Sequence, residues 1–506
     1  MATVPAIKHP ALVSGFMPFN SYPYFLFLAA AVLGYRLLES RSPAGRRVFL
    51  LLASYAFYAW WRADFLALLM GSTLVNYMIG REIELRRTRG ADRRAFLIGG
   101  LIFNLGLIAL FKYQTLFVST ANEMLNIGLP VSEFFLPLAI SFFTFEQISY
   151  LVDADSGKTR NYSLLDYALF VAYFPHLIAG PIVRHNDLIP QFHAMRSAPG
   201  HDLAAGITLF TIGLAKKTLI ADNLAPFADA IFNAAGRGTP LGLTDSWLGT
   251  LFFSFQIYFD FSAYSDMALG SAVMLGIRLP VNFLSPYKAA SIIEFWRRWH
   301  ISLSAFLRDY LYIPLGGNRG SKARRYLNLF ITMLLGGLWH GANWTFMLWG
   351  GLHGLYLSIN HAFRHLTKGM TPPPMLRLPL HALSVLLTFA ATSLAWIVFR
   401  AETLASAGNV AGGLIGLGDS AVVSFSPLAA VTLVLLFVIV WFMPNSMEIM
   451  WRHNPALPSP YENEPVRPAR RFAWQPTRMQ AVAYGLLCIV AVLALSNLKP
   501  FIYFQF

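Results

Sequence analysis

The sequence predicts an all-α, polytopic integral membrane protein, and three observations support that fold class. Hydrophobic residues make up 56% of the 506 residues and charged residues only 13%, against about 45–50% and about 25% in soluble domains. Several apolar runs approach the length of a membrane helix, roughly 20 residues, and short basic loops separate them. This composition excludes a soluble enzyme and a disordered chain, and the single Cys488 excludes an intrachain disulfide.

The expected spans are the stretches that lack Asp, Glu, Lys and Arg. The first, His9–Tyr35, is interpreted as a membrane helix and not a signal peptide, because no compact basic region precedes it. Tyr326–Phe363 has 38 residues without a formal charge, too many for one span. With the other runs we expect roughly ten to twelve spans. Those runs are Val48–Trp61, Phe65–Gly80, Ala95–Phe111, Phe134–Val152 (which contains Glu146), Tyr167–Val183, Leu378–Phe399, Ser420–Met447 and Met479–Leu498.

Basic loops predict the orientation. Arg36–Arg47, Arg81–Arg94 and Arg452–Arg478 all carry more arginines than acids, and such short loops stay in the cytoplasm. Counting spans from these loops places both termini outside. The net charge of +14 is therefore interpreted as cytoplasmic arginine and not as a nucleic-acid interface. We find no internal repeat and expect one membrane domain over residues 1–506, with a catalytic core at about 130–365 and C-terminal helices at 378–506.

Ionisable residues inside apolar segments are functional candidates because burying them in a bilayer is costly. Phe143–Asp155 is the first such zone, and Gln256–Asp266 is the second. In the second zone Asp260 and Asp266 are either functional or buried structural acids paired with arginines. Lys288–His353 is the third and richest zone.

The third zone predicts two helices. The first carries Glu294, Arg298 and Arg308, with Glu294–Arg298 as an i,i+4 salt bridge, and ends at glycines 316, 317 and 320. Its aromatic side chains, Trp296, Trp299 and Phe306, are expected at the membrane interface. The second helix ends at His340. The basic residues here are either a positive-inside signal or a site for donor phosphates; they are Arg297, Arg298, Arg308, Arg319, Lys322, Arg324 and Arg325.

His340 lies in the sequence GGLWHGANW, where glycines permit a break in the helix. Irregular backbone at membrane depth is tolerated only inside protein or along a cavity. His340 is therefore either a general base in a cavity or a hydrogen-bonded packing residue. His300 is a second candidate that caps or orients. The twelve histidines are scattered without an HExxH motif, so no metal site is expected.

Several long motifs resemble the membrane-bound O-acyltransferase (MBOAT) family, in its bacterial branch that acetylates alginate. They occur in the order LPLAISFFTFEQISYLVD from Leu136, HLIAGPIVR from His176, QIYFDFSAYSDMALG from Gln256, EFWRRWHISLSAFLRDYLYIPLGGNR from Glu294, and GLWHGANWTFMLWG from Gly337. The resemblance implies a helical MBOAT fold with re-entrant or interfacial helices around a central funnel. It also implies that His340 is the essential base and that His300 orients or stabilises.

The resemblance further implies an acetyltransferase of the bacterial inner membrane that takes acetyl groups from cytoplasmic acetyl-CoA. The expected acceptor is an exported alginate-like polysaccharide; the alternatives are peptidoglycan, cellulose and teichoic acid. Expected partners are a periplasmic SGNH-like acetyltransferase, the polymer-synthesis machinery and membrane lipid. The expected donor-binding residues are Arg297, Arg298, Arg308 and Arg319, and the supporting polar residues are Asp260, Asp266, Asn343 and Trp339.

The C-terminal sequence FIYFQF contains Tyr503, which by resemblance is a transient acyl acceptor on the outer side. Otherwise this aromatic ending is an interfacial anchor. A different class of function, a transporter for a polymer or a lipid-linked sugar, predicts inverted repeats that the sequence does not contain.

Overall fold

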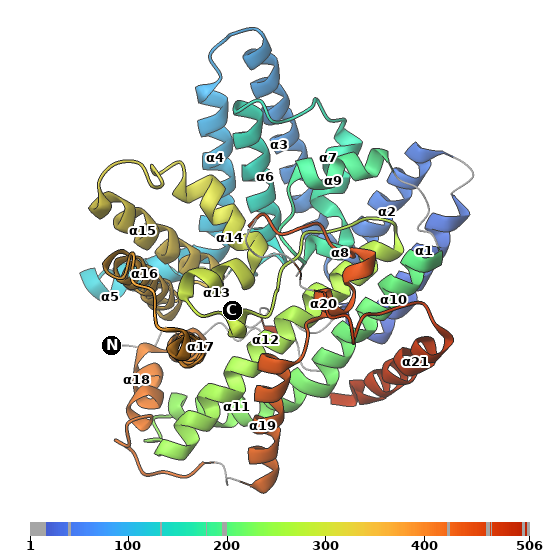
Figure 1. The fold of residues 1–506 in the computed structure, drawn as a ribbon. Helices are drawn as coiled ribbons and strands as arrows, with labels where there is room; N and C mark the ends of the chain where they lie inside the picture. The colour runs from blue at the N-terminus through green and yellow to red at the C-terminus, as the bar shows by residue number, and fades with distance from the viewer. Residues whose placement is uncertain are drawn as a thin grey trace.

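The computed structural model describes residues 17–38, 42–131, 134–178, 180–194, 200–422, 426–461, 466, 468–497 and 501–502. Throughout this part of the chain the regular structure is helical (Figure 1). The only β pairing found there is two isolated bridges, Leu241 with Ser420 and Pro280 with Leu457. The all-α prediction is confirmed.

The N-terminal helices form the part of Figure 1 that runs from blue to teal, where α3, α4 and α6 pack together. Three successive helices, α4, η2 and α5, form one continuous helical segment from Arg94 to Leu125. The helices in this part are α1 (Tyr22–Leu37), α2 (Pro43–Trp61), α3 (Ala63–Thr88), α4 (Arg94–Ile108), η2 (Ala109–Tyr113), α5 (Gln114–Leu125), α6 (Ile140–Asp155), α7 (Leu164–Ala172), α8 (Phe174–Leu177) and α9 (His185–His193).

The long helix α12 runs through the middle of the molecule and packs along α10 and α11 (Figure 1). Short helices and a second packed pair, α15 with α16, follow it. The helices in this part are α10 (Gly200–Ala215), η3 (Lys216–Ala221), α11 (Asp222–Gly236), α12 (Leu243–Met274), η4 (Pro286–Lys288), α13 (Ile292–Arg298), α14 (Ile301–Leu307), η5 (Arg308–Tyr312), α15 (Lys322–His340) and α16 (Trp344–Leu366).

The C-terminal helices surround this centre, and the chain returns to it at its described end (Figure 1). Helix α17 contacts α12 and α16, and α21 packs on α10. The helices in this part are α17 (Pro374–Arg400), α18 (Leu404–Gly413), α19 (Pro427–Phe442), α20 (Ser446–Ile449), η6 (Trp451–His453), α21 (Arg478–Leu493) and η7 (Ala494–Asn497).

Four helical segments in the described chain are long and apolar enough to cross a membrane, namely Ala63–Thr88, Arg94–Leu125, Asp202–Gly236 and Pro374–Arg400. Three shorter apolar helices, α1, α19 and α21, accompany them. The segment Asp202–Gly236 is absent from the sequence prediction, because Lys216, Lys217 and Asp222 interrupt its apolar run. The total of ten to twelve spans stays a prediction.

Two predicted helices are divided. The run Tyr167–Val183 is not one span: it contains α7, α8 and irregular chain, and the break falls at Tyr173, close to Pro175. The helix predicted from Glu294 to Arg308 is broken at Trp299 and His300, between α13 and α14. Its aromatic residues are buried inside the protein, with exposed fractions of 8% for Trp296, 1% for Trp299 and 6% for Phe306. Their position at the membrane interface stays a prediction.

The predicted break after His340 is confirmed. Helix α15 ends there, Gly341 is extended with φ −164°, and Asn343 begins α16 as its N-cap. The two helices touch through glycine: a Cβ on Gly337 would lie 2.2 Å from the Phe346 carbonyl oxygen, and one on Gly350 would lie 2.3 Å from that of Met333. This backbone contact holds the end of α15 against α16.

Candidate active site

His340 lies at the C-terminal end of α15 in an aromatic environment, with only 5% of its surface exposed. Its ring centroid is 5.0 Å from Trp339, 5.0 Å from Trp349 and 5.3 Å from Phe399. Trp349 and Phe399 come from α16 and α17, so three helices enclose the imidazole. Enclosure by aromatic rings excludes water from this nitrogen base.

His300 occupies the break between α13 and α14, where its φ of 43° is in the left-handed region. Such a conformation is uncommon for a non-glycine residue and occurs often at functional sites. Its Nδ1 lies 3.2 Å from Asn282 Oδ1, an oxygen that also accepts from the Ser302 amide and hydroxyl. Because that oxygen can only accept, Nδ1 carries the proton and Nε2 keeps a lone pair.

The structure brings the two histidines together, as the family resemblance implies. Their ring centroids are 6.5 Å apart, and Trp339 lies 6.2 Å from His300. Phe261 of α12 packs edge-on against the His300 ring at 4.7 Å. Both imidazoles therefore face one aromatic compartment between α12, α14, α15 and α16.

Four buried polar atoms in and beside this compartment have no hydrogen-bond partner among the described residues. They are His300 Nε2, Trp339 Nε1, Trp349 Nε1 and His353 Nε2. His353 has its other nitrogen fixed, since Trp296 Nε1 donates to Nδ1 at 3.2 Å. Buried polar atoms are normally paired, so this cluster has hydrogen-bonding capacity that the described residues leave unused.

Asp260 and Asp266 of α12 are paired with lysines, not with the arginines that the sequence analysis considered. Lys217 Nζ lies 2.7 Å from Asp260 Oδ1 and 2.8 Å from Asp222 Oδ1. Lys216 Nζ lies 2.6 Å from Asp266 Oδ2, whose other oxygen accepts from Ser446. The lysines are adjacent in the π-helix η3, which gives each of them an aspartate on the facing helix.

The chain's described end returns to the same region. The Ile502 amide donates to Asp260 Oδ2 at 2.7 Å, and Phe501 stacks on Tyr264 at a centroid distance of 4.0 Å. Phe501 is also 5.6 Å from Phe261, the ring that packs on His300. The candidate relay Tyr503 is the next residue and lies outside the described residues.

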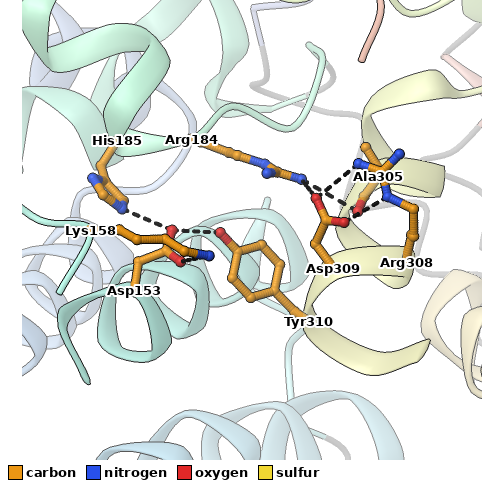
Figure 2. A network of polar contacts seen from close by, with 8 residues as sticks. All are labelled: Asp153, Lys158, Arg184, His185, Ala305, Arg308, Asp309 and Tyr310. Carbon is orange, nitrogen blue, oxygen red and sulfur yellow. Dashed lines mark hydrogen bonds and ion pairs between the residues drawn. The ribbon is translucent and has the colours of Figure 1, made fainter. Parts of the chain in front are cut away.

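The arginine candidates separate into two groups. Arg308 and Arg184 both bind Asp309 (Figure 2). The Arg308 guanidinium lies 5.0 Å from the centroid of the Tyr461 ring. Burial raises the pKa of the Tyr461 hydroxyl, whereas the charges of Arg308, Arg297 and Arg184 act in the opposite direction. Arg308 therefore lies over Tyr461 and shares Asp309 with Arg184.

The remaining two predicted donor-binding residues are placed differently. Arg298 Nη2 forms the expected i,i+4 salt bridge with Glu294 Oε1 at 2.6 Å. Arg319 is exposed in the glycine-containing turn before α15.

A second polar network lies beside this arginine group (Figure 2). His185 Nε2 is 3.1 Å from Asp153 Oδ2, and the Tyr310 hydroxyl donates to the same oxygen at 2.7 Å. These bonds tie the end of α6 to α9 and η5, which fixes the helix that carries Arg308 and Asp309.

The predicted supporting residues at the α15–α16 junction differ in their surroundings. Asn343 Oδ1 accepts from the Thr345 amide at 3.1 Å, and its Nδ2 donates to the Glu402 carbonyl at 2.9 Å. Both ends of the Asn343 side-chain amide therefore form hydrogen bonds with backbone groups. Trp339, in contrast, packs its indole ring near both histidines, and its buried Nε1 has no hydrogen-bond partner among the described residues. No group of three or more potential metal ligands is assembled within the described chain.

Comparison with known proteins decides the family. Residues 109–399 match the membrane-bound O-acyltransferase family, and this range covers more than half of the chain. This chain belongs to the MBOAT family. It is a multi-pass membrane protein and an O-acyltransferase, which decides against the transporter alternative.

Individual MBOAT relatives cover most of the chain. The chain is 40% identical over 538 aligned residues to the probable alginate O-acetylase AlgI of Pseudomonas aeruginosa, covering 97% of this chain and 100% of the relative. It is 43% identical to the peptidoglycan O-acetyltransferase of Helicobacter pylori, covering 78% of each. It is 28% identical to the teichoic acid D-alanyltransferase of Streptococcus thermophilus, covering 52% and 68%.

Several residues of this MBOAT site escaped the sequence analysis. Asn282 and Trp349 carry no charge, and nothing in their local sequence distinguishes them from other polar or aromatic residues. Lys112 offered a signal: it is the one charged residue between Ala95 and Asn122, inside a membrane-length helical segment.

Proposed function

We propose that this MBOAT protein transfers acetyl groups from a cytoplasmic thioester donor, acetyl-CoA, towards an exported alginate-like polysaccharide. The observation that carries the proposal is the set of unpaired buried polar atoms around the two histidines. The oxygens of a thioester carbonyl and of a hydroxyl can accept hydrogen bonds from the unpaired N–H groups. The hydroxyl can also donate a hydrogen bond to His300 Nε2. The aromatic walls exclude water, which would otherwise hydrolyse the thioester.

In the proposed reaction His340 is the general base. It removes the proton of the accepting hydroxyl as that oxygen attacks the thioester carbonyl. The Trp339 indole N–H donates to the oxyanion that forms. The carbon–sulfur bond then breaks, and the thiolate takes the proton from His340. His300, whose Nδ1–H is held by Asn282, uses the lone pair on Nε2 to orient the hydroxyl.

The donor is proposed to enter beside Tyr461. Arginine guanidinium groups bind phosphate through paired hydrogen bonds. Arg308 lies over the Tyr461 ring, and Arg297, Arg298 and Arg319 are proposed to complete the phosphate site. Arg308 and Arg184 both form ion pairs with Asp309. A donor phosphate that binds Arg308 would therefore replace the ion pair between Arg308 and Asp309.

The proposed acceptor polymer is inferred from the relatives of this chain. The P. aeruginosa relative is named for alginate, the H. pylori relative for peptidoglycan and the S. thermophilus relative for teichoic acid. We propose an alginate-like polymer because the alginate relatives of P. aeruginosa and Azotobacter vinelandii align over 97% of this chain. Peptidoglycan, teichoic acid and cellulose stay as alternatives.

The proposed location is the bacterial inner membrane with both termini periplasmic, as the basic loops indicate. Tyr503 is proposed to carry the acetyl group as an ester to a periplasmic acetyltransferase. The docking of Phe501 and Ile502 beside the histidine compartment supports this, since it brings the adjacent backbone near the base.

The His340→Ala variant tests the proposal. Loss of the general base is expected to lower acetyl transfer by about 100-fold or more. The measurement is acetyl content of the host polymer by mass spectrometry, with folded protein quantified in parallel. His361→Ala, in the same helix pair but partly exposed, is the matched control and is expected to retain transfer. Normal acetylation by folded His340→Ala protein would contradict the proposed function.

A further inference from the structure

Lys112 is an ionisable side chain inside a helical segment that is long enough to cross a membrane, Arg94–Leu125. Placing a lysine there is costly, so a partner or a function is expected. The residue lies in η2, a five-residue π-helix between α4 and α5. Single π-turns inside longer helices recur at functional sites because they redirect side chains.

The partners of Lys112 are at the end of α15. Its Nζ donates to the Trp339 carbonyl at 2.5 Å, to the His340 carbonyl at 3.2 Å and to Ser141 Oγ at 3.4 Å. The next residue, Tyr113, also binds the end of α15, because its hydroxyl donates to the Leu338 carbonyl at 2.8 Å. Two adjacent side chains therefore serve three consecutive carbonyls.

These carbonyls need external donors. The last four carbonyls of an α-helix have no partner within the helix. At membrane depth water does not supply one, and each unsatisfied group costs several kcal/mol. An ammonium group has three donors, which matches the three acceptors around Lys112. A cation also offsets the partial negative charge at a helix C-terminus.

We propose that Lys112 is a positioning residue for His340. With Tyr113 it fixes the last turn of α15, and so sets where the imidazole lies relative to His300 and the Trp339 indole. The contact with Ser141 extends this control to the beginning of α6. The proposal rests on the proposed role of His340 as the base, and it assigns Lys112 no contact with the reacting atoms.

The test compares acetyl transfer by Lys112→Met, Lys112→Arg and Lys368→Met, each quantified per folded molecule in detergent or proteoliposomes. Loss of supporting contacts to a catalytic group typically costs about 10–100-fold. Lys112→Met is expected to show that decrease in kcat with little change in KM for the donor. Lys112→Arg retains donors and a charge, so it is expected to keep more of the rate. Lys368 is exposed in the loop after α16, so its change to Met is the matched control.

A folded Lys112→Met protein with unchanged kcat would overturn the inference, as would equal kcat losses in the Met and Arg variants. If Lys112→Met does not fold, Tyr113→Phe replaces it, because that change removes one hydroxyl. A lost hydrogen bond of about 1 kcal/mol corresponds to a several-fold lower kcat, and an unchanged kcat would again overturn the inference. Activity retained in His340→Ala would instead refute the proposed function.

Discussion

Asn282 shows how one uncharged side chain can fix the position of a buried histidine, His300. Its Oδ1 faces His300 Nδ1 and the Ser302 amide and hydroxyl, while its Nδ2 donates to Ser265 Oγ of α12 at 3.2 Å. Its backbone carbonyl also accepts from the Ile301 amide at 3.0 Å. These bonds hold the left-handed turn at His300 and select the tautomer with a free Nε2.

We expect Asn282→Leu to lower acetyl transfer by about 10–100-fold, because the His300 ring loses the acceptor that fixes its orientation and tautomer. The measurement is the transfer rate per folded molecule. Asn318→Leu, an exposed asparagine in the turn before α15, is the control and is expected to be near wild type. Wild-type activity in Asn282→Leu would contradict this role of Asn282.

At the level of helices, the contact between α15 and α16 places His340. Gly337 and Gly350 let the two backbones touch, so any side chain there meets a carbonyl oxygen and not a flexible group. At Gly351, one residue later, an added Cβ would meet only side-chain atoms, at 3.7 Å or more. Gly337 and Gly351 therefore offer a comparison between a glycine of α15 that close packing requires and a glycine of α16 that has room for a side chain.

Gly337→Ala is expected to destabilise the protein by about 1–3 kcal/mol, because the added methyl group would separate the helices. Gly351→Ala is expected to be neutral or slightly stabilising, since alanine favours helix and fits the space. Thermal unfolding in detergent compares the two variants. Equal midpoints of thermal unfolding for the two variants would show that the close contact between α15 and α16 does not limit the stability of the folded protein.

For the whole molecule, the most consequential feature is that Phe501 and Ile502, the last described residues, pack at the centre beside α12. The Ile502 amide binds Asp260, which is 242 residues earlier in the chain. Asp260 is itself held by the buried Lys217, which also binds Asp222. The tail is therefore attached to the same helix, α12, that packs against His300.

Tyr503→Phe is expected to abolish polymer acetylation, because phenylalanine lacks the hydroxyl that would carry the acetyl group. Mass spectrometry of the C-terminal peptide from protein trapped during turnover is expected to find an acetyl ester on the native tyrosine. Tyr484→Phe in α21 is the control and is expected to support normal acetylation. Full acetylation by Tyr503→Phe would leave the tail as an aromatic anchor.

The sequence alone determined the fold class, the family and the position of His340 at a helix end. The fold class and the helix end depend on local composition, because charge-free runs form helices in a bilayer and glycines next to a histidine can end one. The family depends on a resemblance carried by several long motifs in one order. Local pattern also predicted the Glu294–Arg298 salt bridge, whose partners are one helical turn apart.

Only the tertiary structure decided which groups surround that histidine. Asp260 is paired with Lys217, from the preceding helical segment. Lys112 donates to the carbonyls of residues that lie 227 and 228 positions later in the chain. The break at His300 depends on Asn282, 18 residues earlier. Contacts over such separations are set by how helices pack, because the energy of a buried polar group depends on the partner that folding brings to it and not on its neighbours in sequence.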